Sequence, residues 1–174
     1  MQTLLLPKKW NAAASQISSA ITHKWQFSDS ERIKCNFDGA WDEKGSVGGF
    51  GIVVRNSEGG FMAAKAIKEE GVRSTLHAEA ADARAVMLFL RKWGTERVQV
   101  AGDALLVTSA IQNAGAALSG HYGQLFEDTR QLLQGFKQWK VTFGRRETNK
   151  VVHRLARFSL TIDHSVFWFE EPNF

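Results

Sequence analysis

Apolar and polar residues alternate along the first half of the chain in a way that is typical of β-strands. The alternation runs over residues 33–38, 49–56 and 61–67, and a Ser57-Glu58-Gly59-Gly60 turn separates the last two stretches. Successive side chains of a strand point to opposite faces of a sheet, so each stretch is expected to bury one face. The short connections predict that the three strands form an antiparallel meander.

The period becomes helical after the third strand. Apolar or small residues recur at helical spacing over residues 76–93, and Gly94 provides a stop signal. Ser74 or Thr75 is a suitable N-cap residue for this helix. The helix therefore follows the meander directly and is expected to pack on one face of its sheet.

Strand and helix patterns alternate through the second half of the chain. They predict a strand at 97–101, helices at 104–113 and 122–136, a strand at 139–143 and a last helix at 148–162. The order is then βββαβααβα. A meander followed by alternating strands and helices predicts an α/β fold in which helices cover a mixed sheet.

The chain is long enough for one domain with a real core, and its patterning divides it into three parts. Residues 1–30 show no sustained periodicity and are interpreted as a poorly ordered leader. The domain is expected to span residues 31–162. Residues 163–174 form a tail whose aromatic residues can pack back on the domain.

Composition excludes several classes of protein. No apolar run reaches 18 residues, so no membrane span is expected, and the N-terminus lacks the features of a secretory signal. Cys35 is the only cysteine, which rules out an internal disulfide and suits a reducing compartment. We therefore expect an intracellular protein, either nuclear or cytoplasmic.

Positive charge is concentrated near the C-terminus. Residues 139–158 carry a net charge of +5, whereas the whole chain carries +4. A local basic face favours a polyanionic partner such as a nucleic acid, and a merely solvated helix-and-loop face is the alternative.

Three acidic residues are the strongest candidates for chemistry. Asp38 ends the first predicted strand, Asp103 ends the fourth, and Glu79 lies in the first turns of the long helix. Each residue alone is more typical of a turn. The carboxyl ends of parallel strands meet at one edge of a sheet, however, so these three side chains are expected to converge there.

Converging carboxylates repel one another unless cations neutralise them. Oxygen ligands are what Mg²⁺ prefers, and two such ions can activate a water and stabilise the leaving oxygen of a phosphodiester. The sequence therefore predicts a metal site for phosphodiester chemistry. It contains no Cys/His cluster for zinc and no Gly-x-x-x-x-Gly-Lys phosphate loop.

The ordered set of motifs resembles ribonuclease H over residues 31–162. The matching segments are Phe37-Asp38-Gly39-Ala40, Gly48-Gly49-Phe50-Gly51-Ile52-Val53-Val54-Arg55, Ala78-Glu79-Ala80, Gly102-Asp103-Ala104 and Asn149-Lys150-Val151-Val152-His153-Arg154-Leu155-Ala156. The pattern is most similar to plant ribonuclease-H-like domains, including those at the C-terminus of non-LTR retrotransposon reverse transcriptases, which are similar to the archaeal type. The resemblance implies a five-stranded mixed sheet in the order 3-2-1-4-5 with helices on both faces.

The resemblance also implies roles for individual residues. Asp38, Glu79 and Asp103 match the first three metal-binding carboxylates, which would hold two Mg²⁺ ions, with Mn²⁺ as a substitute. His153 stands where many members of the family have an aspartate. Imidazole is a poorer ligand for Mg²⁺ than carboxylate. His153 would either bind the second metal or carry protons, and a histidine at the rim of a helix surface is the alternative.

Contacts with nucleic acid are implied around the same edge. Some family members carry a long basic insertion where this chain has the short neutral loop 114–120. Other residues of this chain must therefore bind the substrate. The candidates are Arg145, Arg146, Asn149 and Lys150. Gly39, Ala40 and Thr75 match positions that touch the RNA strand, where 2′-hydroxyl groups distinguish RNA from DNA.

The implied function is that of a metal-dependent endonuclease that cuts the RNA strand of an RNA–DNA hybrid. A non-catalytic nucleic-acid-binding domain that keeps the fold is the rival hypothesis, and the histidine at position 153 is the reason for it. A segment of a larger reverse transcriptase polyprotein is a third hypothesis, compatible with either.

Overall fold

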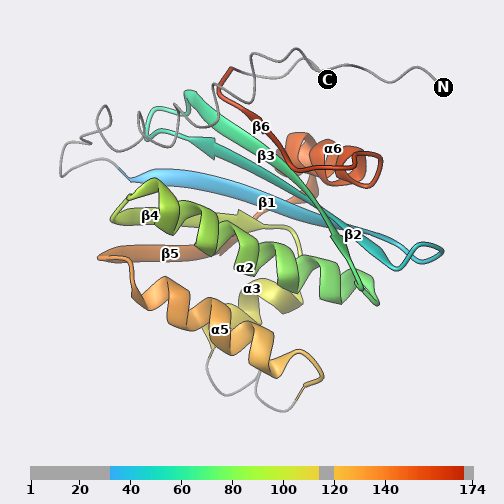
Figure 1. Cartoon of the computed structure of the whole chain (residues 1–174). Helices are drawn as coiled ribbons and strands as arrows, with labels where there is room; N and C mark the ends of the chain where they lie inside the picture. Colours follow the sequence, from blue (N-terminus) through green and yellow to red (C-terminus); the bar gives the residue numbers. More distant parts are fainter. Residues whose placement is uncertain (1–31, 114–119, 171–174) are drawn as a thin grey trace. The chain divides into compact units, whose positions relative to one another are not determined.

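The computed structural model describes residues 32–113 and 120–170, which form a mixed six-stranded sheet with helices on both faces (Figure 1). The strands are β1 (Ile33–Asp42), β2 (Val47–Arg55), β3 (Phe61–Glu70), β4 (Arg97–Gly102), β5 (Gln138–Phe143) and β6 (Val166–Trp168). Their order across the sheet is β5-β4-β1-β2-β3-β6. β1 pairs antiparallel with β2 and parallel with β4, and β4 pairs parallel with β5. The first three strands are therefore the predicted meander.

The helices lie on two sides of this sheet. They are α2 (Thr75–Trp93), α3 (Leu105–Gln112), α5 (Gly123–Gln134) and α6 (Lys150–Ser159), and a 3₁₀ turn, η1 (Arg146–Asn149), precedes α6. Figure 1 shows α2, α3 and α5 gathered on one face and α6 on the other. Of the helices in the described ranges, none is both long enough and apolar enough to cross a membrane.

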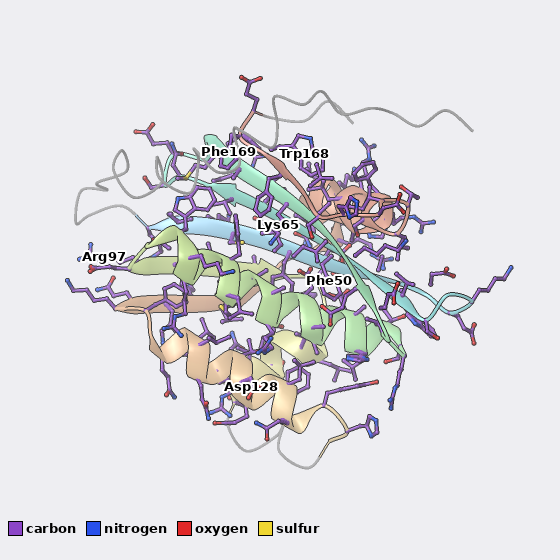
Figure 2. All side chains as sticks on the ribbon, in the orientation of Figure 1. Phe50, Lys65, Arg97, Asp128, Trp168 and Phe169 are labelled. Carbon is purple, nitrogen blue, oxygen red and sulfur yellow. The ribbon has the colours of Figure 1, made fainter. Side chains whose placement is uncertain are left out.

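The predicted fold class and the order 3-2-1-4-5 of the first five strands are confirmed. β6, which comes from the predicted tail, extends the sheet beyond β3 as a sixth strand. Trp168 of β6 packs against the core cluster that includes Val53 and Leu155. Lys65 of β3 lies over the ring of Phe167 with its Nζ 4.5 Å from the ring centroid, and Figure 2 shows Lys65 and Trp168 along this edge. The predicted leader at 1–30 and most of the loop 114–120 lie outside the described residues.

Helix α2 is placed by its caps and by a close approach to β1. Ser74 is the N-cap and accepts a hydrogen bond from the His77 N–H, and Gly94 ends the helix at φ 79°. A Cβ atom at Gly39 would lie 2.7 Å from the backbone carbon of Ala78. Only glycine therefore allows α2 to lie this close to β1, and this contact brings the first turns of α2 against β1 directly after Asp38.

Helix α6 packs on the opposite face through the buried stripe Val152, Leu155, Ala156 and Ser159. It crosses β2 where the strand has Gly49 and Gly51 instead of larger residues, and a Cβ atom at either position would meet the backbone of α6. The glycine-rich segment of β2 thus allows α6, the helix that carries His153, to pack closely on the sheet.

We expect Gly51→Ala to lower the free energy of unfolding by about 1–3 kcal/mol, the usual cost of overpacking a core. The added Cβ would meet the Val152 carbonyl oxygen and lie 2.7 Å from the Ala156 backbone nitrogen, so α6 would have to move. Urea denaturation measures the change. Gly45→Ala is the control, because the nearest atom to its Cβ is a side-chain oxygen of Asp42 at 3.1 Å. Equal stability of the two variants would contradict this account of the packing.

Candidate metal centre and nucleic-acid interface

Three carboxylates converge where the parallel pairing of β1 with β4 ends. The sequence placed Asp38 at the end of the first strand, but Asp38 lies inside β1, because the strand continues to Asp42 in its pairing with β2. Phe37 of β1 pairs with Gly102 of β4, and Asp38 and Asp103 follow these two residues directly. Glu79 reaches the same point from α2. One carboxylate oxygen from each of the three acids lies within 4.8 Å of the others. The structure therefore brings together the three acidic side chains that the sequence singled out.

Burial makes two of these carboxylates, those of Glu79 and Asp38, costly to ionise. Burial, with a further contribution from the charge of Asp38, raises the pKa of Glu79 to about 9, and the Gly39 N–H, which donates to Glu79 Oε2 at 3.3 Å, offsets this only in part. Burial also raises the pKa of Asp38, the charge of Asp103 adds to this, and the contact with His153 opposes it. A cluster of oxygen donors whose charges repel one another fits a hard divalent cation.

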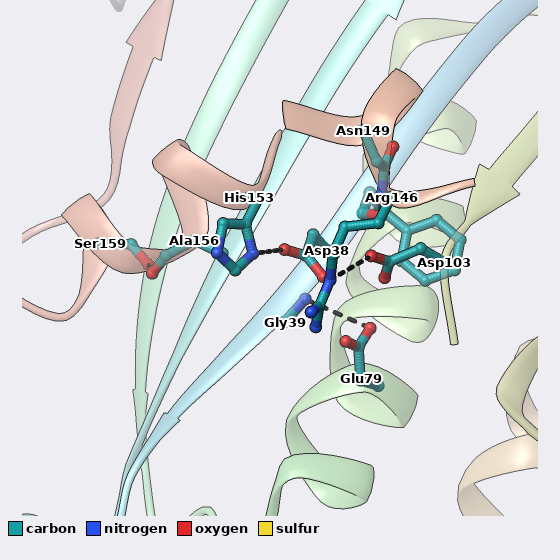
Figure 3. A network of polar contacts seen from close by, with 10 residues as sticks. Asp38, Gly39, Glu79, Asp103, Arg146, Asn149, His153, Ala156 and Ser159 are labelled. Atoms are coloured by element: carbon teal, nitrogen blue, oxygen red, sulfur yellow. Dashed lines mark hydrogen bonds and ion pairs between the residues drawn. The ribbon is translucent and has the colours of Figure 1, made fainter. Parts of the chain in front are cut away.

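His153 lies beside this cluster and contacts one of its members. Its Nδ1 is 2.7 Å from Asp38 Oδ2, as Figure 3 shows. The His153 side chain is 41% exposed, whereas that of Asp38 is 4% exposed. This contact orients the Asp38 carboxylate and leaves Nε2 as the ring nitrogen that can act toward solvent or a ligand. A direct role of His153 in metal binding stays a prediction.

Asn149 has a different role from the nucleic-acid contact predicted for it. Its side chain is buried, Nδ2 donates to the Phe37 carbonyl at 2.9 Å, and Oδ1 accepts from Asn36 Nδ2 at 3.0 Å. These bonds fix η1 on β1 immediately before Asp38. Because the amide is engaged and shielded by protein, Asn149 positions the site instead of offering a surface contact. The partner, Asn36, was missed, although a polar residue within a strand is a recognisable signal.

The other candidates for nucleic-acid contact lie around the cluster. The exposed ones are Thr75, Arg145, Arg146 and Lys150. Gly39 is buried and its N–H points to Glu79, while Ala40 is half-buried. The Nε atom of Arg146 lies 3.7 Å from Asp103 Oδ2, so this arginine already meets the acidic cluster. Arg146 is thus placed where a phosphate backbone could approach the carboxylates, and contacts of the other exposed residues with nucleic acid stay predictions.

Asp82 is an acidic residue of the site that the sequence reasoning missed. It lies one helical turn after Glu79 and is 0% exposed, and both its carboxylate oxygens lack a hydrogen-bond partner among the described residues. Burial raises its pKa well above the usual range, and the charges of Glu79 and Asp38 raise it further. The backbone amides of Asp38 and Gly51 lie near without hydrogen-bonding geometry and oppose this only in part. Burial among these carboxylates therefore disfavours the ionised form of Asp82. The i+3 spacing from Glu79 was the available signal.

Comparison with known proteins assigns the family. Residues 36–159 match the model of the family described as reverse transcriptase-like. The chain belongs to this family. It carries a ribonuclease-H-like domain, as the sequence motifs predicted. No curated protein sequence matches the chain.

Solved structures support the same assignment. RNase H1 from the archaeon Halobacterium salinarum NRC-1 is 25% identical, with a TM-score of 0.68 over 75% of this chain and 98% of that one. The N-terminal RNase H domain of a Mycobacterium tuberculosis protein is 21% identical, with a TM-score of 0.66 over 76% and 95%. LC11-RNase H1, isolated from compost and solved with an RNA/DNA hybrid, is 15% identical, with a TM-score of 0.62 over 74% and 99%. The last two similarities show the fold alone.

Proposed function

We propose that this ribonuclease-H-like domain is a metal-dependent endonuclease that hydrolyses the RNA strand of RNA–DNA hybrids. The observation that carries the proposal is the convergence of three carboxylates within 4.8 Å at the carboxyl edge of the sheet. The donor set consists of oxygens, which suits Mg²⁺, with Mn²⁺ as a substitute. Two bound ions would supply an activated water and stabilisation of the leaving oxygen.

The chain's own residues then have distinct tasks. Asp38, Glu79 and Asp103 would hold the metal ions, and the Gly39 N–H, which donates to Glu79 Oε2, helps to fix the orientation of this carboxylate within the cluster. His153 holds Asp38 through Nδ1, and its partly exposed ring would carry a proton during the reaction. These contacts keep the carboxylates oriented before any ligand arrives.

The substrate is proposed from the surroundings of the cluster. The exposed side chains of Arg145, Arg146 and Lys150 would contact phosphates without reading sequence. Thr75 and the backbone near Ala40 would meet the RNA strand at its 2′-hydroxyl groups. The RNA/DNA hybrid in the LC11-RNase H1 structure supports this choice of substrate. The reverse-transcriptase-like family supports the further proposal that the domain is part of a larger polyprotein.

Substrate choice tests this function. Hydrolysis is measured on an RNA–DNA hybrid with a labelled RNA strand, beside duplex DNA and duplex RNA of the same sequence. We expect only the RNA strand of the hybrid to be shortened. Cleavage of duplex DNA at the same rate would show that the site does not recognise 2′-hydroxyl groups, and the proposed substrate would be wrong.

A non-catalytic nucleic-acid-binding domain is the second candidate function. The observation that favours it is the position of His153, which contacts Asp38 in place of the aspartate that many family members have there. Such a domain would bind hybrids through its basic groups without turnover. Substitution of His153 separates the two functions.

His153→Ala is expected to slow cleavage by about 10²-fold or more, the usual contribution of a positioned proton carrier. His153→Asp is expected to retain activity and to favour Mg²⁺ over Mn²⁺, because a carboxylate restores a hard oxygen ligand. Initial rates across pH 6–9 with each metal measure both effects. Val151→Ala, an exposed change on the same helix, is the control. Wild-type rates and an unchanged pH profile in His153→Ala would make His153 a bystander.

A further inference from the structure

Arg146 makes an ion pair with the acidic cluster that the proposed function does not explain. Its Nε lies 3.7 Å from Asp103 Oδ2, and Figure 3 shows the guanidinium group directed toward the carboxylates. The Arg146 side chain is 82% exposed, whereas that of Asp103 is 9% exposed. Only the head group of the arginine therefore meets the cluster. An ion pair with one partner this exposed is weak and can exchange readily.

The backbone that carries Arg146 is fixed, although its side chain is exposed. Arg146 is the first residue of η1, and Asn149 at the other end of this turn is bonded to Phe37 and Asn36 of β1. The turn is thus held at the rim of the acidic cluster. The arginine head group can leave Asp103 without any change in the fold and still stay within reach of a ligand at the site.

We propose that Arg146 competes with the divalent metal for Asp103 and, once displaced, binds a phosphate of the nucleic acid. This inference rests on the proposed function. A guanidinium group and a dication repel each other, so Asp103 cannot serve both at close range. Phosphate oxygens accept the paired N–H donors of arginine in a bidentate geometry, which gives the displaced side chain a better partner than solvent.

The competition makes two binding events depend on one side chain. In the protein without nucleic acid, the Arg146–Asp103 pair must break before metal binds, so Arg146 lowers the metal affinity. A phosphate that holds Arg146 away from Asp103 removes this obstacle. Binding of metal and of nucleic acid therefore favour each other, and by linkage the effect is reciprocal. Arg146 would thus make metal binding more favourable in the substrate-bound protein than in the free protein.

Two affinities measured separately test this proposal, and neither involves turnover. Mn²⁺ affinity without nucleic acid is obtained from the electron paramagnetic resonance signal of free Mn²⁺. Hybrid affinity in EDTA is obtained from fluorescence anisotropy. For Arg146→Gln we expect Mn²⁺ to bind about fivefold more tightly and the hybrid to bind more weakly. Arg157→Gln is the matched control, since it removes the same charge from an exposed position of α6 and is expected to change Mn²⁺ affinity less than about twofold.

Each alternative outcome contradicts a specific part of the account. Weaker hybrid binding with unchanged Mn²⁺ affinity in Arg146→Gln would leave Arg146 as a phosphate contact alone and overturn the competition. An equal gain in Arg157→Gln would show a general charge effect and overturn it as well. If the wild-type protein bound no Mn²⁺, the metal site of the proposed function would itself be wrong, and this inference would fall with it. Circular dichroism of both variants checks that the fold is retained.

Discussion

Asp103→Asn is expected to reduce cleavage of the hybrid by about 10²- to 10³-fold, the size of effect seen when one electrostatic stabiliser is removed from an active site. The amide keeps the shape of the side chain but removes its charge, so the cluster of three carboxylates holds a hard dication less well. The loss of activity should appear at every accessible Mg²⁺ concentration, and it should be smallest at the highest Mg²⁺ concentration.

The same change should leave the protein folded. The charge of Asp103 raises the pKa of Asp38, so its removal relieves repulsion, and the metal-free melting temperature should stay the same or rise. Asp128→Asn is the control, because Asp128 lies on α5, where Figure 2 labels it, pairs with Arg84 and is not one of the three clustered carboxylates. Wild-type cleavage by Asp103→Asn would remove Asp103 from the site, whereas unfolding of the variant would contradict the repulsion argument.

Stability of the metal-free protein is expected to fall as the pH rises from about 4.5 to about 9. Glu79 has an ordinary value of 4.5 and a pKa of about 9 in the folded protein. Between these limits the folded state holds a proton that the unfolded chain has released. The contribution of Glu79 is therefore fully present below pH 4.5 and is lost as the pH rises, with a slope of up to about 1.4 kcal/mol per pH unit.

Glu79→Gln isolates this effect, because the amide is neutral at every pH. Urea denaturation in EDTA between pH 5 and 8.5 should give a flatter pH dependence for the variant than for the wild type. Added Mg²⁺ should stabilise the wild type more as the pH rises, since the metal needs the ionised carboxylate. Identical slopes for the two proteins would mean that Glu79 is ionised at neutral pH without a metal and that its burial is not decisive.

Local patterns account for most of the fold. Alternation specified β1, β2 and β3, and capping residues placed both ends of α2 at Ser74 and Gly94. The position of β4 beside β1 was implied by the resemblance to the family, and the structure shows that the two strands are parallel. β6 was missed because three residues are too few for a period of two to be recognised, and its pairing with β3 depends on the tertiary fold.

The site was predictable where its residues follow from strand and helix patterns. Asp103 directly follows β4, and Asp38 lies beside it because Phe37 is the last residue of β1 that pairs with β4, although β1 itself continues to Asp42. The burial of Asn149 and of Asp82 depends on how η1 and α2 are rotated against the sheet, which no local pattern specifies. The contact of Arg146 with Asp103 depends on a side-chain conformation that only the structure gives.

Addition of Mg²⁺ to a preformed complex tests the central claim most directly. The wild-type protein is first bound to a hybrid with a labelled RNA strand in EDTA, where we expect binding and no cleavage. Excess Mg²⁺ is then added, and the RNA strand should be cut in the wild-type complex but not in a parallel sample with Asp103→Asn. Binding without cleavage before and after the addition of Mg²⁺ or Mn²⁺ would contradict the account and leave a nucleic-acid-binding domain without nuclease activity.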